Sequence, residues 1–239
     1  MLPHPIINEK WQAPIMTSIL LHQWAFSPFC GKVRRILEHK GLDYEVKNYN
    51  GLLALQVPKL SSAGKLPVLD IDGERIQDSR RIAAALEQRF PDKPLVPGDP
   101  QARAQMEILQ DWADESLYWY EVFFRGFYDR AWGLLLDSLT AGRPVWEKPM
   151  LNVVARNQFR QKLRAQGIGR QDKASVEERF RLLLQSLDTQ LRGRDWLIGT
   201  DKTLADIAVA SQLHEILRTG HLAQDFAAAQ EVSRWLQTV

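Results

Sequence analysis

Cysteine is nearly absent from this chain of 239 residues, because Cys30 is the only one. A single thiol excludes an internal disulfide and any metal site built from several cysteines, and it fits a reducing compartment. The sequence also lacks any apolar run near the roughly 20 residues that cross a bilayer. Its first residues lack the basic start and apolar stretch of a secretory signal. We therefore expect a cytoplasmic protein that does not associate with membranes.

Neither sign of charge is in excess, since 31 lysines and arginines stand against 29 aspartates and glutamates. Without a strong positive field, nucleic acid is not an expected partner. The five histidines form no His-Glu-x-x-His pair, and the sequence has no serine-hydrolase elbow, phosphate-binding loop or dinucleotide fingerprint. No metal is therefore expected. The stretch 148–171 is basic without an acidic residue, and a solvated helix face is favoured there over an anion or partner site.

The first ninety residues predict a small α/β unit after an extension at 1–17 that has no periodic pattern. Ser27 is a typical N-cap and Pro28 suits the first position of a helix, while Gly41 suits its end. Asp72-Gly73 is a typical hairpin turn. The predicted elements are, in order, a strand at 18–24, a helix at 28–40, a strand at 44–48, a hairpin at 65–76 and a helix at 78–89.

Four prolines between 91 and 100 predict a linker, and the remainder, 101–239, has the periodicity of an all-helical domain. The predicted domains are therefore 18–90 and 101–239. Thr203 and Asp206 have the spacing of a capping box, so Asp206→Ala should cost about 1 kcal/mol, and more if the side chain is buried. The predicted helices are 101–139, 150–166, 174–192, 203–219 and 226–237.

The start of the predicted helix at 28–40 is the segment best suited to a catalytic site. A strand leads to a helix N-terminus, where unpaired N–H groups and the helix dipole favour an anion, including a thiolate. If the protein handles a thiol cofactor, the Ser27 hydroxyl would help to hold its charged form and so lower the pKa of that thiol. A serine that only caps the helix explains the same residues equally well.

Four segments in order carry a resemblance to the glutathione transferase superfamily. Ser27-Pro28-Phe29-Cys30 resembles the thioredoxin-like Cys-x-x-Cys segment with serine in the first place, and Gly64 to Leu69 resembles the transferase segment whose proline is cis. Gln77 to Ile82 resembles the acid-serine motif that binds glutathione, and Gly199 to Ala208 resembles the C-terminal folding motif. The resemblance implies an α/β thioredoxin-like N-terminal domain followed by an all-α helical-bundle C-terminal domain.

The resemblance also implies a glutathione site with a role for each motif residue. Lys65 would reach the glycyl carboxylate, and the Leu66 backbone, turned outward by a cis bond to Pro67, would pair with the cysteinyl part. Ser79 would hold the γ-glutamyl carboxylate while Asp78 faces its ammonium group. The alternative is that Asp78 and Ser79 only cap a helix. Glutathione is thus the expected co-substrate, and a homodimer is expected from the family.

Three hypotheses for function follow. The first is a glutathione transferase, active in detoxification, that ionises glutathione near Ser27 and conjugates it to a small apolar electrophile. The second is a non-catalytic glutathione-fold module that binds a partner, because the long stretch 128–171 resembles metaxin-like and failed-axon-connections relatives. The third is a reductase or peroxidase that uses Cys30. Since Cys30 occupies the second motif position, core packing or slow mixed-disulfide formation is favoured for it over a role as nucleophile.

Aromatic side chains gather between Asp111 and Trp132, where nine of the 22 aromatic residues of the chain stand. Such a helix is usually buried on more than one side, so most of these rings are expected in the core. Some of them are expected to line an apolar pocket for the electrophile. The nine are Trp112, Tyr118, Trp119, Tyr120, Phe123, Phe124, Phe127, Tyr128 and Trp132.

Overall fold

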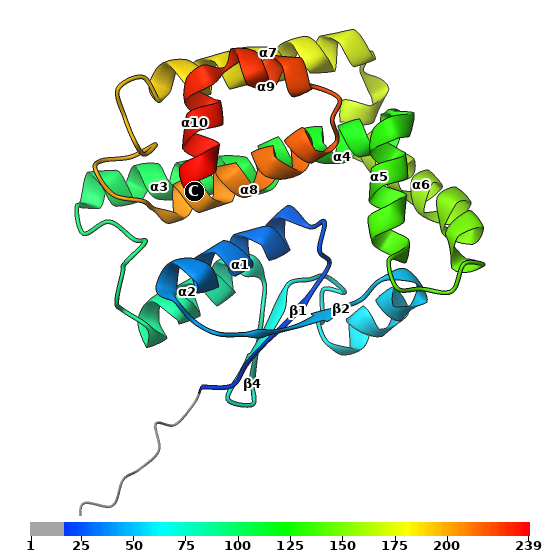
Figure 1. Cartoon of the computed structure of the whole chain (residues 1–239), viewed down its shortest axis with the longest axis horizontal. Helices are drawn as coiled ribbons and strands as arrows, with labels where there is room; N and C mark the ends of the chain where they lie inside the picture. Colours follow the sequence, from blue (N-terminus) through cyan, green and yellow to red (C-terminus); the bar gives the residue numbers. More distant parts are fainter. Residues whose placement is uncertain (1–16) are drawn as a thin grey trace, which may run out of the picture.

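The computed structural model describes residues 17–239, so the predicted extension at 1–17 lies outside the described residues except for Thr17. The first half folds as strands and helices around a four-stranded sheet with the order β2-β1-β3-β4 (Figure 1). β1 and β2 are parallel, and the other two pairs are antiparallel. The elements are β1 (Ile19–Gln23), α1 (Pro28–Lys40), β2 (Glu45–Asn48), the 3-10 helix η1 (Gly51–Lys59), β3 (Val68–Ile71), β4 (Glu74–Gln77) and α2 (Ser79–Arg89).

The register of the sheet brings three chain segments to one of its ends. His22, near the end of β1, pairs with Val68 at the start of β3. Val68 in turn pairs with Gln77 at the end of β4. Because β3 runs against both neighbours, the residues after β1, before β3 and after β4 all leave the sheet on the same side. Those residues are 24–27, 66–67 and 78–79.

Helix α1 has the ends that its sequence predicts. Ser27 is the N-cap, Pro28 is the first helical residue, and Gly41 closes the helix with a left-handed φ of 69°. The apolar stripe of Val33, Ile36 and Leu37 is fully buried. It joins the core that α1 shares with α2 and with the helical half of the chain, where α1 packs against α8 (Leu204–Arg218).

The second half is helical, with α8 lying alongside α1 (Figure 1). The predictions of one helix over 101–139 and one over 226–237 are wrong. Tyr128 is extended and divides α4 from α5, because its ring contacts that of His221 with centroids 3.6 Å apart and its hydroxyl donates to Glu177. The helices are α3 (Pro100–Trp112), the π-turn η2 (Ala113–Leu117), α4 (Tyr118–Phe127), α5 (Asp129–Thr140), α6 (Glu147–Gln166), the 3-10 turn η3 (Ile168–Arg170), α7 (Lys173–Gln190), α8, α9 (Ala223–Ala228) and α10 (Gln230–Thr238).

The capping box at the start of α8 is present, as predicted. The Asp206 carboxylate accepts hydrogen bonds from the Thr203 N–H and hydroxyl, both at 2.9 Å. It also accepts the Leu197 N–H at 2.8 Å and the Trp235 indole N–H at 3.1 Å. Asp206 is wholly buried. One carboxylate therefore ties α8 to the preceding loop and to α10.

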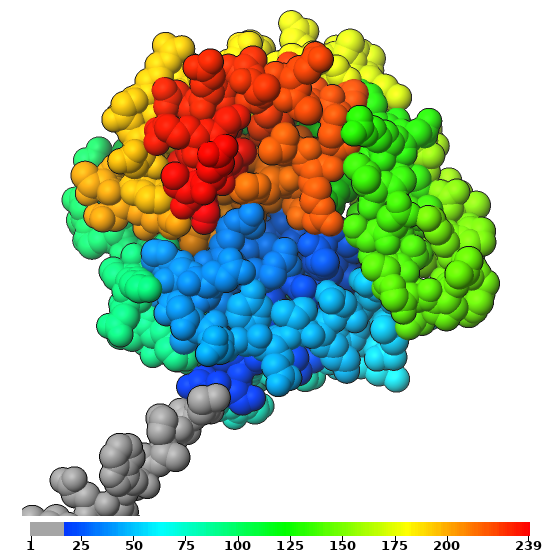
Figure 2. All heavy atoms as spheres, viewed as in Figure 1, coloured from blue at the N-terminus to red at the C-terminus, as the bar shows by residue number. Residues whose placement is uncertain are grey.

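Helices α5 and α6 reach down to the first half of the chain, and Figure 2 shows their green atoms against the cyan atoms of η1. The buried Glu147 accepts the Leu52 N–H at 2.9 Å, and the Asn50 side chain donates to the Ala141 carbonyl at 3.0 Å. The basic stretch forms α6 and η3, where Lys148 pairs with Asp137 of α5. Of the helices in residues 17–239, none is both long and apolar enough to cross a membrane.

Candidate functional site

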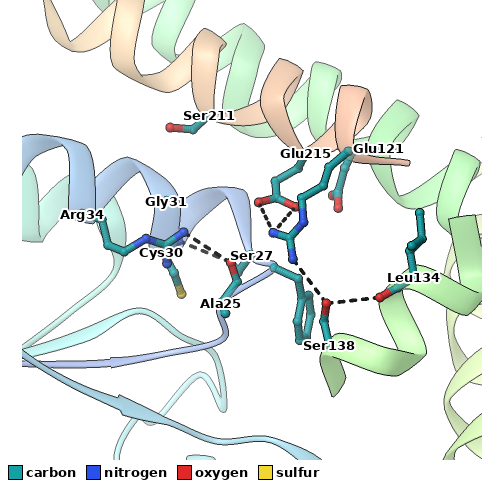
Figure 3. Close-up of polar contacts among 12 residues, drawn as sticks. Ala25, Ser27, Cys30, Gly31, Arg34, Glu121, Leu134, Ser138, Ser211 and Glu215 are labelled. Atoms are coloured by element: carbon teal, nitrogen blue, oxygen red, sulfur yellow. Dashed lines mark hydrogen bonds and ion pairs between the residues drawn. The ribbon is translucent and has the colours of Figure 1, made fainter. Parts of the chain in front are cut away.

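Ser27 lies at the N-terminus of α1 (Figure 3). Its hydroxyl oxygen accepts the Cys30 N–H at 3.4 Å, and its carbonyl accepts the Gly31 N–H at 2.9 Å. The residue is only 7% exposed within the chain. No acidic residue stands in the first turn of α1, so nothing there opposes an anion at the positive end of the helix dipole.

Cys30 is fully buried against Tyr49, Val57, Leu66 and Val68. Burial raises the pKa of its thiol to about 11, although the hydrogen bond with Ser27 acts in the opposite direction. At neutral pH the sulfur is therefore a neutral thiol without access to solvent. A thiol in that state is a poor nucleophile, since reactivity belongs to the thiolate.

The peptide bond between Leu66 and Pro67 is cis, as the resemblance implies. Leu66 precedes the first ladder residue of β3, Val68, so it stands just outside the sheet. Its side chain packs in the same cluster as Cys30, which places this segment next to the start of α1. Lys65 is exposed.

Asp78 caps α2 with a carboxylate oxygen that accepts the N–H groups of Arg80 at 2.9 Å and Arg81 at 3.2 Å. Its φ of 75° lies in the left-handed region, which non-glycine residues seldom adopt. Ser79 begins the helix and is 4% exposed. The motif residues thus do form a helix cap, and they do so at the end of the sheet that Ser27 and Pro67 share.

A buried ion pair stands beside this cap and could not be found from sequence spacing, because its partners are 82 residues apart. Lys32 Nζ lies 2.8 Å from Asp114 Oδ2, and both side chains are buried. Burial lowers the pKa of Lys32 and raises the pKa of Asp114, and the charge of Asp78 acts on both. Among the residues that the structure describes, none donates a hydrogen bond to the buried Asp114 Oδ1.

A second buried charge cluster supports the turn before Ser27. Arg125 of α4 donates to the Phe26 carbonyl at 2.9 Å and pairs with Glu121 and Glu215, all three side chains being buried. Arg218 pairs with the same Glu215 at 3.1 Å. Figure 3 shows Glu121 and Glu215 above the turn that carries Ser27. Burial raises the pKa of Glu121 to about 7.

The aromatic segment divides between core and site. Four of the nine rings, those of Tyr120, Phe123, Phe124 and Trp132, are buried, and the other five are half-buried and packed against the core. Tyr118 contacts Phe29 of the Ser27 motif with ring centroids 5.0 Å apart. The pocket of about 480 Å³ next to Trp119 is lined only by helical-half residues. A larger pocket of about 930 Å³ between 93–99 and 196–203 contains none of the residues of the glutathione motifs, so volume alone does not mark the site.

The sequence indicated Ser27, Lys65, Leu66, Pro67, Asp78 and Ser79 as candidate site residues, and the register brings the segments that contain them together. It missed Lys32 as the partner of Asp114, and it missed the Arg125 cluster, although Glu121 and Arg125 have the spacing of a helical ion pair. For Lys32, the absence of an acidic neighbour within its own helix turn was the signal for a distant partner. Within residues 17–239, no three histidine, cysteine, aspartate or glutamate side chains are grouped to hold a metal ion.

Comparisons with known proteins point to one family. Residues 21–94 match the glutathione S-transferase N-terminal domain, and residues 153–239 match the glutathione S-transferase C-terminal domain. An isoprene-epoxide glutathione S-transferase of Rhodococcus sp. is 27% identical over 193 residues, covering 80% of each chain. FtsZ-localized protein A of Caulobacter vibrioides is 29% identical over 216 residues, covering 88% of this chain and 82% of that protein.

Among solved structures, the β-etherase LigF of Sphingobium sp. superposes with a TM-score of 0.67 at 23% identity, covering 92% of this chain and 94% of that one. At that identity the similarity is evidence for the fold alone. Two domain matches in the expected order, together with the thioredoxin-like sheet and the helical second half, agree with the motifs at 27–30, 64–69, 77–82 and 199–208. The chain therefore belongs to the glutathione transferase superfamily.

Proposed function

We propose that this protein binds reduced glutathione at the shared end of the sheet and conjugates its sulfur to a small apolar electrophile. One observation carries the proposal. The strand register brings the Ser27 cap, the cis Leu66–Pro67 bond and the Asp78–Ser79 cap to one place. Each of these is suited to a different part of the tripeptide, so their convergence matches one extended ligand.

The chemistry assigned to Ser27 follows from how its hydroxyl is used. The oxygen already accepts the Cys30 N–H, and a hydroxyl has one hydrogen to donate besides its acceptor sites. In the proposed complex that hydrogen would be donated to the sulfur of glutathione. Together with the N-terminus of α1 it would stabilise the thiolate and lower the pKa of the bound thiol. The thiol proton would leave to solvent, and the thiolate would then form the carbon–sulfur bond as a bond of the electrophile breaks. In an epoxide this is a carbon–oxygen bond, whose oxygen takes up a proton, and in an aryl halide it is the carbon–halogen bond, which releases halide.

The remaining residues would bind rather than react. The exposed Lys65 would meet the glycyl carboxylate, and the Leu66 backbone, outside the sheet ladder, would pair with the cysteinyl part. The N-terminus of α2 at Ser79 would hold the γ-glutamyl carboxylate, and the Asp78 carboxylate would face the ammonium group. Phe29 and Tyr118 supply apolar rings close to Ser27 for the electrophile.

The test is calorimetric titration with glutathione, followed by conjugation assays with an epoxide and an aryl halide. Ser27→Ala should bind glutathione within a few-fold of wild type but lose turnover by roughly a hundredfold, the scale of a lost anion-stabilising donor. The matched control is Cys30→Ser, which should keep its turnover. Failure of the wild-type protein to bind glutathione would refute the proposal.

A second candidate is a glutathione-fold module that binds a partner and catalyses nothing. It is favoured by the 7% exposure of Ser27 and by the packing of Phe26 against Trp132, Leu135 and Leu136, which covers the turn. The similarity to FtsZ-localized protein A, whose name records a location and no reaction, points the same way. Glutathione binding without turnover on either electrophile would favour this candidate. A Cys30 reductase is disfavoured, since that thiol is buried and neutral.

The homodimer also remains a proposal, resting on the family alone. Sedimentation equilibrium of the full chain tests it directly. A monomer at micromolar concentration would contradict it, whichever of the two functions holds.

A further inference from the structure

The peptide unit that joins Phe26 to Ser27 is held at both of its polar ends. Its N–H, on Ser27, donates to the Trp24 carbonyl at 3.1 Å. Its C=O, on Phe26, accepts from Arg125 at 2.9 Å. Because a peptide unit is planar and rigid, two anchors on opposite sides fix the orientation of its plane. The direction in which the Ser27 side chain leaves the backbone is fixed with it.

Arg125 is itself held in place from several sides. It is 6% exposed and contacts Glu121 of its own helix, Glu215 of α8 and, through its guanidinium face, the Phe26 ring at 5.8 Å. Arg218 holds the other side of Glu215. A planar guanidinium donates in several fixed directions at once, which an ammonium group does not. The helical half of the chain thus sets the geometry of a turn 99 residues earlier.

We infer that Arg125 is a positioning residue for Ser27, setting the angle at which the hydroxyl meets the sulfur of glutathione. The inference rests on the proposed transferase function. Arg125 acts through orientation and not through a long-range positive field, because the Glu215 carboxylate lies against its guanidinium and opposes its charge directly. Its removal should therefore affect the ionisation of the bound thiol more than the affinity for glutathione, which depends on Lys65, Leu66 and Ser79.

The discriminating variant is Arg125→Lys, which keeps the charge in the buried cluster but loses the forked geometry. Its matched control is Arg218→Lys, since Arg218 pairs with the same Glu215 and with Ser138 but has no hydrogen bond to the turn. Thiolate absorbance in the ultraviolet gives the pKa of glutathione bound to each variant. For Arg125→Lys we expect that pKa to rise by about one unit and kcat at neutral pH to fall roughly tenfold, with KM for glutathione within about twofold.

Arg218→Lys should match wild type in all three quantities. If Arg125→Lys keeps the wild-type thiol pKa and kcat, or if both variants lose activity alike, the inference is overturned while the proposed function stands. Absence of glutathione binding in the wild type overturns the proposed function instead. Should Arg125→Lys not fold, Arg125→Met with Glu121→Gln removes the guanidinium together with one buried carboxylate. A wild-type thiol pKa in that double variant would equally overturn the inference.

Discussion

Replacing Asp206 by alanine should be among the most damaging single changes in the helical half. The carboxylate accepts four hydrogen bonds from Thr203, Leu197 and Trp235 in a site without solvent access. Alanine would leave three N–H donors and a hydroxyl without a protein partner, and each buried unsatisfied donor costs about 1–3 kcal/mol. Allowing for relaxation around the small residue, we expect a loss of about 4 kcal/mol. That exceeds the roughly 1 kcal/mol of an exposed cap.

Urea unfolding followed by tryptophan fluorescence and by circular dichroism measures this loss. A change of that size lowers the melting temperature of a chain this long by about 10 °C. The matched control is Asp201→Ala, five residues earlier and exposed, where the side chain only accepts from Thr200. Its free energy of unfolding should equal that of the wild type within error. A loss below about 1 kcal/mol for Asp206→Ala would show that water satisfies the donors and would refute the reasoning.

Three further experiments test the buried charges and the buried thiol. Burial raises the pKa of Glu121 from 4.5 to about 7, so the folded state binds more protons than the unfolded state between these pH values. As the pH rises from 4.5 to 7, the free energy of unfolding of the wild type should therefore fall by about 3 kcal/mol relative to that of Glu121→Gln. Urea unfolding at several pH values measures both proteins, and the same pH dependence in the two would contradict this. Lys32→Met should cost about 3 kcal/mol, because it leaves the buried Asp114 with only the more distant Arg80, whose Nε lies 3.8 Å from it. Adding Asp114→Asn should restore part of that loss, and equal urea midpoints for the single and the double variant would disprove this. Iodoacetamide should modify Cys30 rapidly only in urea, as mass spectrometry would show, whereas fast labelling of the native chain at neutral pH would contradict its burial.

Local signals explain why much of the fold could be predicted. Ser27-Pro28, Gly41 and Asp72-Gly73 act through the conformations of their own residues, and the structure places a helix start, a helix end and a hairpin turn there. The break at Tyr128 has no such signal, because the residue is held extended by Glu177 and His221 from later in the chain. Periodicity alone therefore predicted one helix where the structure has α4 and α5.

The candidate site shows the same division between local and distant causes. The caps at Ser27 and Asp78 depend on neighbouring residues, so motifs could indicate them. Asp114, the partner of Lys32, lies 82 residues away, and Glu215, which Arg125 pairs with besides the nearby Glu121, lies 90 residues away. Charged residues on a helix usually indicate a solvated face, and only tertiary packing shows that these two are buried against carboxylates.

The enclosure of Cys30 has a practical meaning for a protein proposed to handle electrophiles. The sequence contains no other thiol, and this one is fully covered by the packing around α1. Reactive compounds that would alkylate an exposed cysteine meet none on the folded protein, so the catalyst would not be consumed by its own substrates. The folded wild-type protein should also not react with thiol reagents. In a Val153→Cys variant, the new exposed cysteine of α6 would be the one site that takes a fluorescent or spin label in the folded protein. The label would report on any movement of α6 when glutathione binds.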